Sequence, residues 1–212
     1  DGVEALQLVR SHVPDIIVSD VMMPRMNGYK LCKTIKEDIN ISHIPVILLT
    51  ARDDRQSQIS GYKNGADGYL SKPFEVEMLM ELIRNRLKNR EYTKKRYLNA
   101  GLIPTPEEST ISLTDETFLI KLNSIIQENI ENSNLGIQFI CQEVGLGRSS
   151  LYNKLKALTG MGANEYISKL RIEKAITLIS GTDMPFSEIA EKTGFTTPSY
   201  FSTAFKQYTG ET

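Results

Sequence analysis

Two matching segments, Ile140-Cys141-Gln142-Glu143-Val144-Gly145 and Ile189-Ala190-Glu191-Lys192-Thr193-Gly194, decide the fold of the second half of this chain. Each is followed by another helix-forming stretch that ends in Thr-Gly. Behind each turn glycine the apolar residues recur at i, i+4 and i+7, as Leu151, Leu155 and Leu158 and again as Phe201, Phe205 and Tyr208. The repeat predicts two helix-turn-helix units in one domain.

The faces opposite these apolar stripes carry hydrogen-bond donors and no carboxylate. They comprise Arg148, Ser149, Tyr152, Asn153, Lys154 and Lys156 in the first copy, and Pro198, Ser199, Ser202, Thr203 and Lys206 in the second. A helix in the major groove needs short polar side chains toward base edges and cations toward phosphates. Solvated faces of an ordinary helical bundle look similar, but two copies favour DNA. Between them, residues 164–179 read as one amphipathic helix that sets the spacing of the two readers.

Residues 115–212 resemble the DNA-binding domain of AraC-type transcription factors. The resemblance rests on residues 140–160, Asn164-Glu165-Tyr166-Ile167, Leu170-Arg171-Ile172, Glu188-Ile189-Ala190, Gly194-Phe195, Ser199-Tyr200-Phe201 and Phe205-Lys206. In that family two helix-turn-helix motifs are joined by a long helix. The resemblance implies base contacts from Ser149, Tyr152 and Asn153 in the first motif, and from Ser199, Ser202 and Thr203 in the second.

Composition fits a multidomain protein without a membrane segment. The 212 residues are 40% apolar and 24% charged, and no run of eighteen apolar residues is present. We therefore expect no membrane contact and a cytoplasmic location. Lys and Arg number 25 against 26 Asp and Glu, so any attraction to DNA must be local. Cys32 and Cys141 lie in helical apolar patterns, which predicts two buried free thiols and no disulfide or metal cluster.

The first ninety residues alternate helix and strand patterns. Helical spacing covers residues 3–9, 29–39, 55–64 and 75–87, and short apolar runs at 16–18, 46–49 and 68–70 read as buried strands. This order predicts an α/β domain with a parallel sheet covered on both faces. Asp20, Thr50 and Lys72 follow the three strands, so they should meet at the carboxyl edge of the sheet. A carboxylate, a hydroxyl and an ammonium suit an acyl phosphate, although each alone could be a helix cap or a solvated end residue.

These positions resemble the receiver domain of two-component response regulators, a flavodoxin-like fold. The matching segments are Pro14-Asp15-Ile16-Ile17-Val18-Ser19-Asp20, Met23-Pro24, Asn27-Gly28, Pro45-Val46-Ile47-Leu48-Leu49-Thr50-Ala51, Gly65-Ala66-Asp67-Gly68-Tyr69 and Lys72-Pro73-Phe74. The resemblance implies that Asp20 accepts a phosphoryl group from a kinase histidine and that Thr50 and Lys72 bind the phosphoryl oxygens. It also implies that Tyr69 repacks as Thr50 moves. The Lys72–Pro73 bond is a candidate for the cis form.

The same resemblance implies a Mg²⁺ ion held by Asp20 and the backbone carbonyl of Met22. Its other acidic ligands follow the first strand of a receiver, whereas Asp1-Gly2 matches the loop after the second strand. We therefore expect a partial receiver fold that lacks the first strand, first helix and second strand, with residues 16–18 on an open edge. We also expect the 212 residues alone to take up phosphate poorly, and the intact parent to be competent.

The expected domain order is a receiver at 1–90, a basic helical extension and linker at 91–113, and an AraC-type domain at 114–212. This order resembles the tail of hybrid two-component regulators. It predicts a phosphorylation-gated transcription regulator, not an enzyme, with a DNA operator, a histidine kinase as phosphodonor and a homodimeric state. One alternative is a silent receiver that serves only dimerisation. A less favoured alternative is a phosphohydrolase with Asp20 as nucleophile, because Met22 stands where haloacid dehalogenase-like enzymes place a second Asp.

Overall fold

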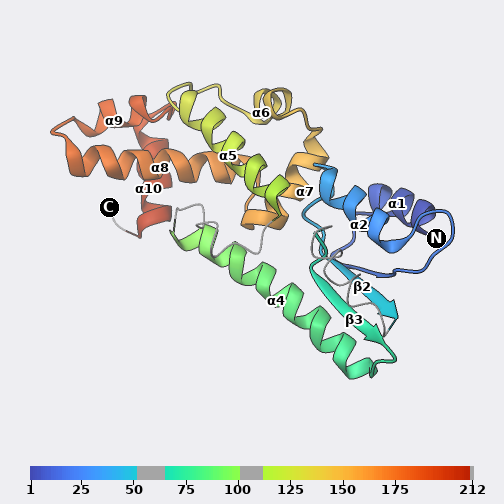
Figure 1. The fold of residues 1–212 in the computed structure, drawn as a ribbon. Coiled ribbons are helices and arrows are strands. Elements are labelled where there is room, and N and C mark those ends of the chain that lie inside the picture. The colour runs from blue at the N-terminus through green and yellow to red at the C-terminus, as the bar shows by residue number, and fades with distance from the viewer. Residues whose placement is uncertain (52–64, 101–111, 211–212) are drawn as a thin grey trace. The chain divides into compact units, whose positions relative to one another are not determined.

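The computed structural model describes residues 1–51, 65–100 and 112–210 (Figure 1). Of these, residues 1–95 and 112–117 form one compact unit, and residues 96–100 and 118–210 form a second. The helix expected at 55–64 and most of the expected linker lie outside the described residues. The two units are taken in turn.

A three-stranded parallel sheet is the framework of the first unit. Its strands are β1 (Ile17–Asp20), β2 (Val46–Ala51) and β3 (Gly68–Lys72), in the order β1-β2-β3. In the register, Asp20 lies beside Leu49, and Lys72 lies beside Ala51. Because all strands run the same way, their carboxyl ends meet at one edge, as the sequence predicts.

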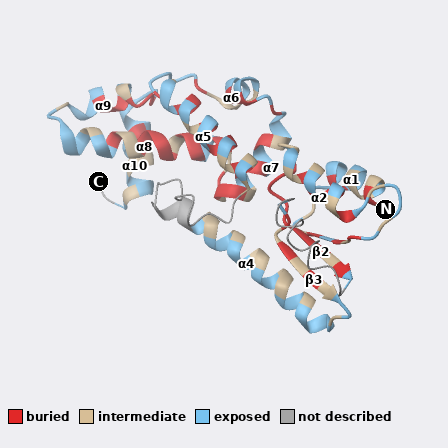
Figure 2. Ribbon diagram, in the orientation of Figure 1, coloured by how far each residue is buried: buried red, intermediate tan, exposed pale blue. Residues whose placement is uncertain are grey.

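Helices cover both faces of this sheet. On one face, α1 (Gly2–Ser11) and α2 (Gly28–Glu37) bury a core of Val9, Ile17, Leu31, Ile35, Val46 and Leu48. On the other lies α4 (Val76–Ala100), where a side chain at Gly68 would meet Leu82 at 3.4 Å. Figure 2 shows α4 exposed along most of its length. This helix continues to Ala100, into the basic helical extension expected from residue 91 onward.

Strand β1 lies at the edge of the sheet. It pairs with β2 on one side, and no other described strand pairs with it on the other. Val18 in this strand is 39% exposed, which is high for an apolar strand residue. The open edge expected from the sequence is therefore present in the described part of the chain.

Six helices follow in the second half of the chain. They are α5 (Leu113–Glu128), α6 (Ile137–Val144), α7 (Arg148–Thr159), α8 (Ala163–Gly181), α9 (Phe186–Lys192) and α10 (Pro198–Thr209). The pairs α6–α7 and α9–α10 are the two predicted helix-turn-helix units, and α8 joins them (Figure 1). The first predicted apolar stripe, Leu151, Leu155 and Leu158, is buried as expected. In the second stripe Phe201 is fully buried and Phe205 packs against the core, but Tyr208 is 40% exposed, so the prediction is wrong for Tyr208.

The two turns repeat in backbone geometry as well as in sequence. Gly145 and Gly194 adopt φ of 72° and 74°, a left-handed conformation that favours glycine. After them, the Leu146 amide donates to the Cys141 carbonyl and the Phe195 amide to the Ala190 carbonyl, each at 3.0 Å. This six-residue closure is the Schellman ending of a helix, and it directs the second helix of each unit away from the first.

A buried arginine connects α8 to other elements of the second unit. The Arg171 guanidinium donates to the Asn132 carbonyl at 2.7 Å, in the turn that follows α5. Its central carbon lies 5.9 Å from the Phe195 ring centroid, in the second helix-turn-helix unit. Burial lowers the pKa of Arg171, although the group remains charged. Phe195 and Phe186 both pack against Phe201, with ring centroids 5.1 and 4.5 Å apart.

The two cysteines differ in environment. Cys32 on α2 is fully buried, and burial raises the pKa of its thiol to about 12. Cys141 on α6 is only half-buried. Both are free thiols, but the prediction that both are buried is wrong for Cys141.

Substituting the two turn glycines should separate backbone strain from steric exclusion. A Cβ at Gly145 meets nothing within 4 Å among the described atoms, whereas one at Gly194 would lie 2.2 Å from the Ile130 carbonyl oxygen and 2.8 Å from Arg171. Gly145→Ala should cost ~1–2 kcal/mol through its positive φ alone. Gly194→Ala should cost a further ~1–3 kcal/mol. Urea unfolding followed by circular dichroism would measure both, and equal losses would contradict the packing described at Gly194.

Candidate phosphoryl-acceptor site and DNA interface

Asp20, Thr50 and Lys72 meet at the carboxyl edge of the sheet, as predicted. The Lys72 ammonium forms an ion pair with Oδ2 of Asp20. The backbone amide of Met22 donates to Oδ1 of the same carboxylate at 3.1 Å. The Lys72–Pro73 peptide bond is cis. Asp20 thus accepts from one charged donor and one backbone donor, and its side chain remains 37% exposed to solvent.

The environment of Asp20 keeps it ionised. The hydrogen bond from Lys72 lowers the pKa of the Asp20 carboxyl, partial burial opposes this, and the Met22 amide adds to the lowering. Because folding lowers this pKa, the pairing stabilises the fold at neutral pH, and that contribution is lost as the pH falls through the lowered value. Asp20 is consequently an ionised carboxylate at physiological pH.

Thr50 lies near the carboxyl end of β2, one residue after Leu49, the register partner of Asp20. It is 2% exposed, and its Oγ1 has no hydrogen-bond partner among the described residues. A buried hydroxyl without a partner costs ~1–3 kcal/mol, which is tolerated where a ligand oxygen can complete the bond. Tyr69, beside Leu48 in the register, packs against the core shared with α1 and α2.

The loop after β1 is held close to the strand it leaves. Asn27 caps α2 by accepting from the Lys30 amide at 2.9 Å, and the Gly28 amide donates to the Val21 carbonyl at 3.0 Å. A Cβ at Gly28 would lie 2.4 Å from the Asp20 carbonyl oxygen. Only glycine therefore allows α2 to start this close to Asp20.

The described residues do not form a complete Mg²⁺ site by themselves. Across residues 1–51, 65–100 and 112–210, no three His, Cys, Asp or Glu side chains gather as metal ligands. Asp20 and the Met22 carbonyl would supply two oxygens, whereas Mg²⁺ requires octahedral coordination. The Mg²⁺ site thus remains a prediction that these residues alone do not satisfy.

In the second unit, the outward face of α7 carries most of the predicted DNA contacts. Arg148, Ser149, Tyr152, Asn153 and Lys156 are exposed. Tyr152 is 55% exposed although it is aromatic. Arg148 also donates to Gln138 of α6 at 3.3 Å, which sequence reasoning missed because the bond joins two helices.

Lys154 does not lie on this face. Its side chain is 0% exposed, and its ammonium lies 5.0 Å from the Phe118 ring centroid. Position 154 falls between Leu151 and Leu158 on the buried side of the helix. The prediction that Lys154 faces the DNA is therefore wrong, and the ammonium is stabilised instead by packing that includes a cation–π contact.

On α10 the predicted contacts Ser199, Ser202, Thr203 and Lys206 are all exposed. Thr197 caps the helix by accepting from the Tyr200 amide at 3.2 Å, and Pro198 occupies the first turn. Tyr200 is 56% exposed and contacts the Phe195 ring edge-on at 5.7 Å. The sequence analysis did not include Tyr200 among the candidate DNA contacts, although the structure exposes it on the same helix as the predicted ones.

A parallel sheet with an aspartate, a hydroxyl and a lysine at its carboxyl edge, followed by a double helix-turn-helix unit, defines a DNA-binding regulator of the signalling class. Comparison with known families agrees. Residues 1–84 match the response regulator receiver domain, and residues 140–212 match a helix-turn-helix domain family. The chain belongs to the two-component response regulators, with a receiver domain followed by an AraC-type DNA-binding domain.

The chain is similar to several known proteins. Over all 212 residues the chain is 42% identical to histidine kinase P4 of Formosa agariphila, of which it spans 15% of the length. It is 30% identical to the probable transcriptional regulator ycf29 of Pyropia yezoensis, covering 78% of this chain and 79% of that protein. The C-terminal domain of the response regulator yesN from Fusobacterium nucleatum is 31% identical, covering 43% of this chain and 94% of that domain, with a TM-score of 0.40.

The helices of the described segments include no candidate membrane span. None of them combines the length and the apolar character that a membrane crossing requires.

Removing the Lys72 ammonium should raise the pKa of Asp20. In Lys72→Ala the main cause of the lowering is gone, so the carboxyl should titrate closer to its ordinary range. Carbon-13 NMR of the Asp20 carboxyl would follow the midpoint. Lys33→Ala, which removes an exposed lysine paired with Glu37 on α2, is the matched control and should leave the midpoint unchanged. An unaltered midpoint in Lys72→Ala would contradict the ion pair.

Proposed function

We propose that this chain is the output segment of a cytoplasmic phosphorelay, in which phosphorylation of Asp20 controls binding of a DNA operator. The observation that carries the proposal is the convergence of an ionised Asp20, a buried unpartnered Thr50 hydroxyl and the Lys72 ammonium at one edge of the sheet. The phosphodonor is the phosphohistidine of a histidine kinase, whose P–N bond is labile.

The side chains present account for the acceptor's part in the transfer. An Asp20 oxygen attacks phosphorus, the P–O bond forms as the P–N bond breaks, and the imidazole leaves to take up a proton. The Lys72 ammonium, which pairs with Asp20, can form an ion pair with one phosphoryl oxygen. The Thr50 hydroxyl can donate a hydrogen bond to another. The new bond would thus give Thr50 the partner it lacks in the described structure.

The Thr50 hydroxyl would also link phosphorylation to the control of DNA binding. If Thr50 turns toward the phosphoryl group, space opens beside the core that Tyr69 packs against, and Tyr69 can move inward. Such a shift favours one receiver surface over another, and we propose that this surface forms a homodimer. A dimer would then place two DNA-binding domains on neighbouring half-sites.

The DNA-binding part of the proposal rests on the exposed faces of α7 and α10. Tyr152 and Asn153 on one helix and Ser202 and Thr203 on the other would contact base edges. Arg148, Lys156 and Lys206 would contact phosphates, and no carboxylate of these two faces opposes them.

Selection from random duplex DNA should enrich a motif with two half-sites about one turn, ~10 bp, apart. On that motif Asn153→Ala should lose ~1–3 kcal/mol of binding free energy while leaving random-sequence binding unchanged. Lys206→Ala should weaken both and reduce the slope of log K against log salt by ~0.9. Lys121→Ala, an exposed lysine on α5, is the control. Retention without any sequence preference would refute specific recognition.

Asp20→Asn in the full-length protein tests the gating. A phosphodonor should raise the operator affinity of the wild type by ~5–150-fold and leave the Asn variant unaffected. The matched control is Asp15→Asn, an exposed carboxylate just before β1, which should respond like the wild type. Equal affinity with and without donor in the wild type would instead identify a silent receiver. Continuous release of many equivalents of phosphate would indicate a phosphohydrolase.

A further inference from the structure

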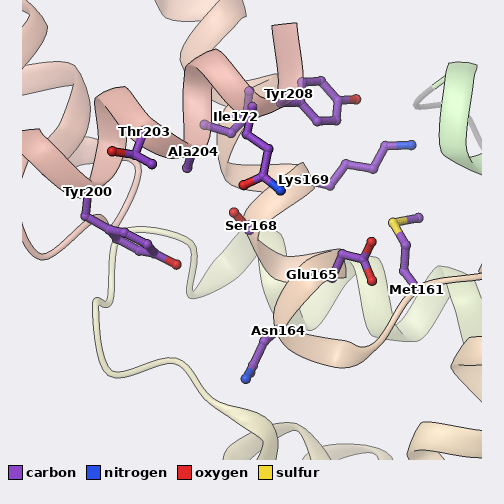
Figure 3. A pocket seen from close by; sticks show the side chains of 11 residues that line it. Met161, Asn164, Glu165, Ser168, Lys169, Ile172, Tyr200, Thr203, Ala204 and Tyr208 are labelled. Atoms are coloured by element: carbon purple, nitrogen blue, oxygen red, sulfur yellow. The ribbon is translucent and has the colours of Figure 1, made fainter. Parts of the chain in front are cut away.

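A groove of about 590 Å³ lies between α8 and α10. Figure 3 shows Asn164 and Ser168 of α8 on one side and Tyr200 and Thr203 of α10 on the other. Gln207 of α10 also lines it, and Met161, just after α7, lies at one end. The groove therefore lies between the connecting helix α8 and the second helix of the second helix-turn-helix unit, α10.

The groove borders the exposed face of α10, and one of its lining residues, Met161, follows shortly after the end of α7. Thr203 belongs at once to the outward face of α10 and to the groove lining. At the other end, a Cβ at Gly162 would lie 3.9 Å from the Tyr152 ring of α7, and Gly162 stands between Met161 and the first groove residue of α8. A duplex that received both helices in successive major grooves would present its intervening backbone to this groove.

The two charged side chains of the groove are already engaged. Glu165 accepts from the Gly162 amide at 3.2 Å and so caps α8. Lys169 is 6% exposed and lies 3.7 Å from Glu173, which also accepts from Tyr208 at 3.0 Å. The groove consequently offers no uncompensated cation with which to attract a phosphate.

The groove offers neutral hydrogen-bond donors. Within the described part of the chain, the side chains of Asn164, Ser168 and Gln207 have no hydrogen-bond partner. Hydroxyl and amide groups of this kind commonly bind phosphate and sugar oxygens of DNA, where they fix the position of the protein. Their contribution should depend little on salt, because no counterion is displaced by a neutral group.

We propose that this groove binds the sugar–phosphate strand that crosses between the two half-sites, through Asn164, Ser168 and Gln207. This inference rests on the proposed DNA-binding function. It adds a second, uncharged set of backbone contacts to those of Arg148, Lys156 and Lys206. The groove thereby fixes the spacing of the half-sites without reading a base.

The double variant Ser168→Ala/Gln207→Ala tests the groove, with Gln127→Ala/Ser180→Ala as the matched control. The control removes the same two side-chain types at exposed positions on α5 and on the far end of α8. Operator binding of the full chain is measured at several salt concentrations, and circular dichroism checks the fold. The groove variant should bind the operator roughly tenfold more weakly, with a salt slope parallel to the wild type, and the control should be unchanged.

Hydroxyl-radical footprinting gives a second reading. The wild type should protect sugars between the two half-sites, and the groove variant should lose that protection while keeping both half-site footprints. Unchanged affinity and footprint in the groove variant would overturn the inference and leave the proposed function intact, as would a reduced salt slope. A wild-type chain that selects no operator would overturn the proposed function and the groove's role together.

Discussion

The second unit depends on the buried guanidinium of Arg171. From the middle of α8 it donates to the Asn132 carbonyl, next to the first helix-turn-helix unit, and lies against the Phe195 ring of the second. The same group occupies the space where a side chain at Gly194 would lie. One cation of α8 thus contacts both the turn that precedes α6 and the ring that follows the second turn glycine, so it links the two helix-turn-helix units through the core.

In the first unit the candidate site is formed by the carboxyl ends of parallel strands. Parallel pairing brings Asp20 and Lys72 to one edge although 52 positions separate them. The close fit of Gly28 against the Asp20 carbonyl then limits how far the acceptor loop can move. Among the described residues the buried Thr50 hydroxyl has no hydrogen-bond partner, so it is available to a ligand oxygen at this edge of the sheet.

Local sequence patterns predicted the helices and strands well, but they predicted poorly the contacts between residues that are far apart in the sequence. The alternation of apolar runs gave the parallel sheet, and the repeated turn glycines gave both helix-turn-helix units. The sequence analysis placed Lys154 on the outward face, whereas its helical position lies between Leu151 and Leu158 on the buried side. Its ammonium lies 5.0 Å from the ring centroid of Phe118, a contact with a residue far away in the sequence. The groove was likewise unpredictable, because Ser168 and Gln207 become neighbours only when α8 and α10 pack.

The unequal cysteines make the chain suitable for single-site chemical labelling. A thiol reacts as its thiolate, and the Cys32 thiol, fully buried with a pKa of about 12, is both inaccessible and protonated. Cys141 is partly accessible on α6, the first helix of the first helix-turn-helix unit. A maleimide dye would thus attach to α6 without any engineered mutation, and its fluorescence would report on that helix as the protein engages a duplex.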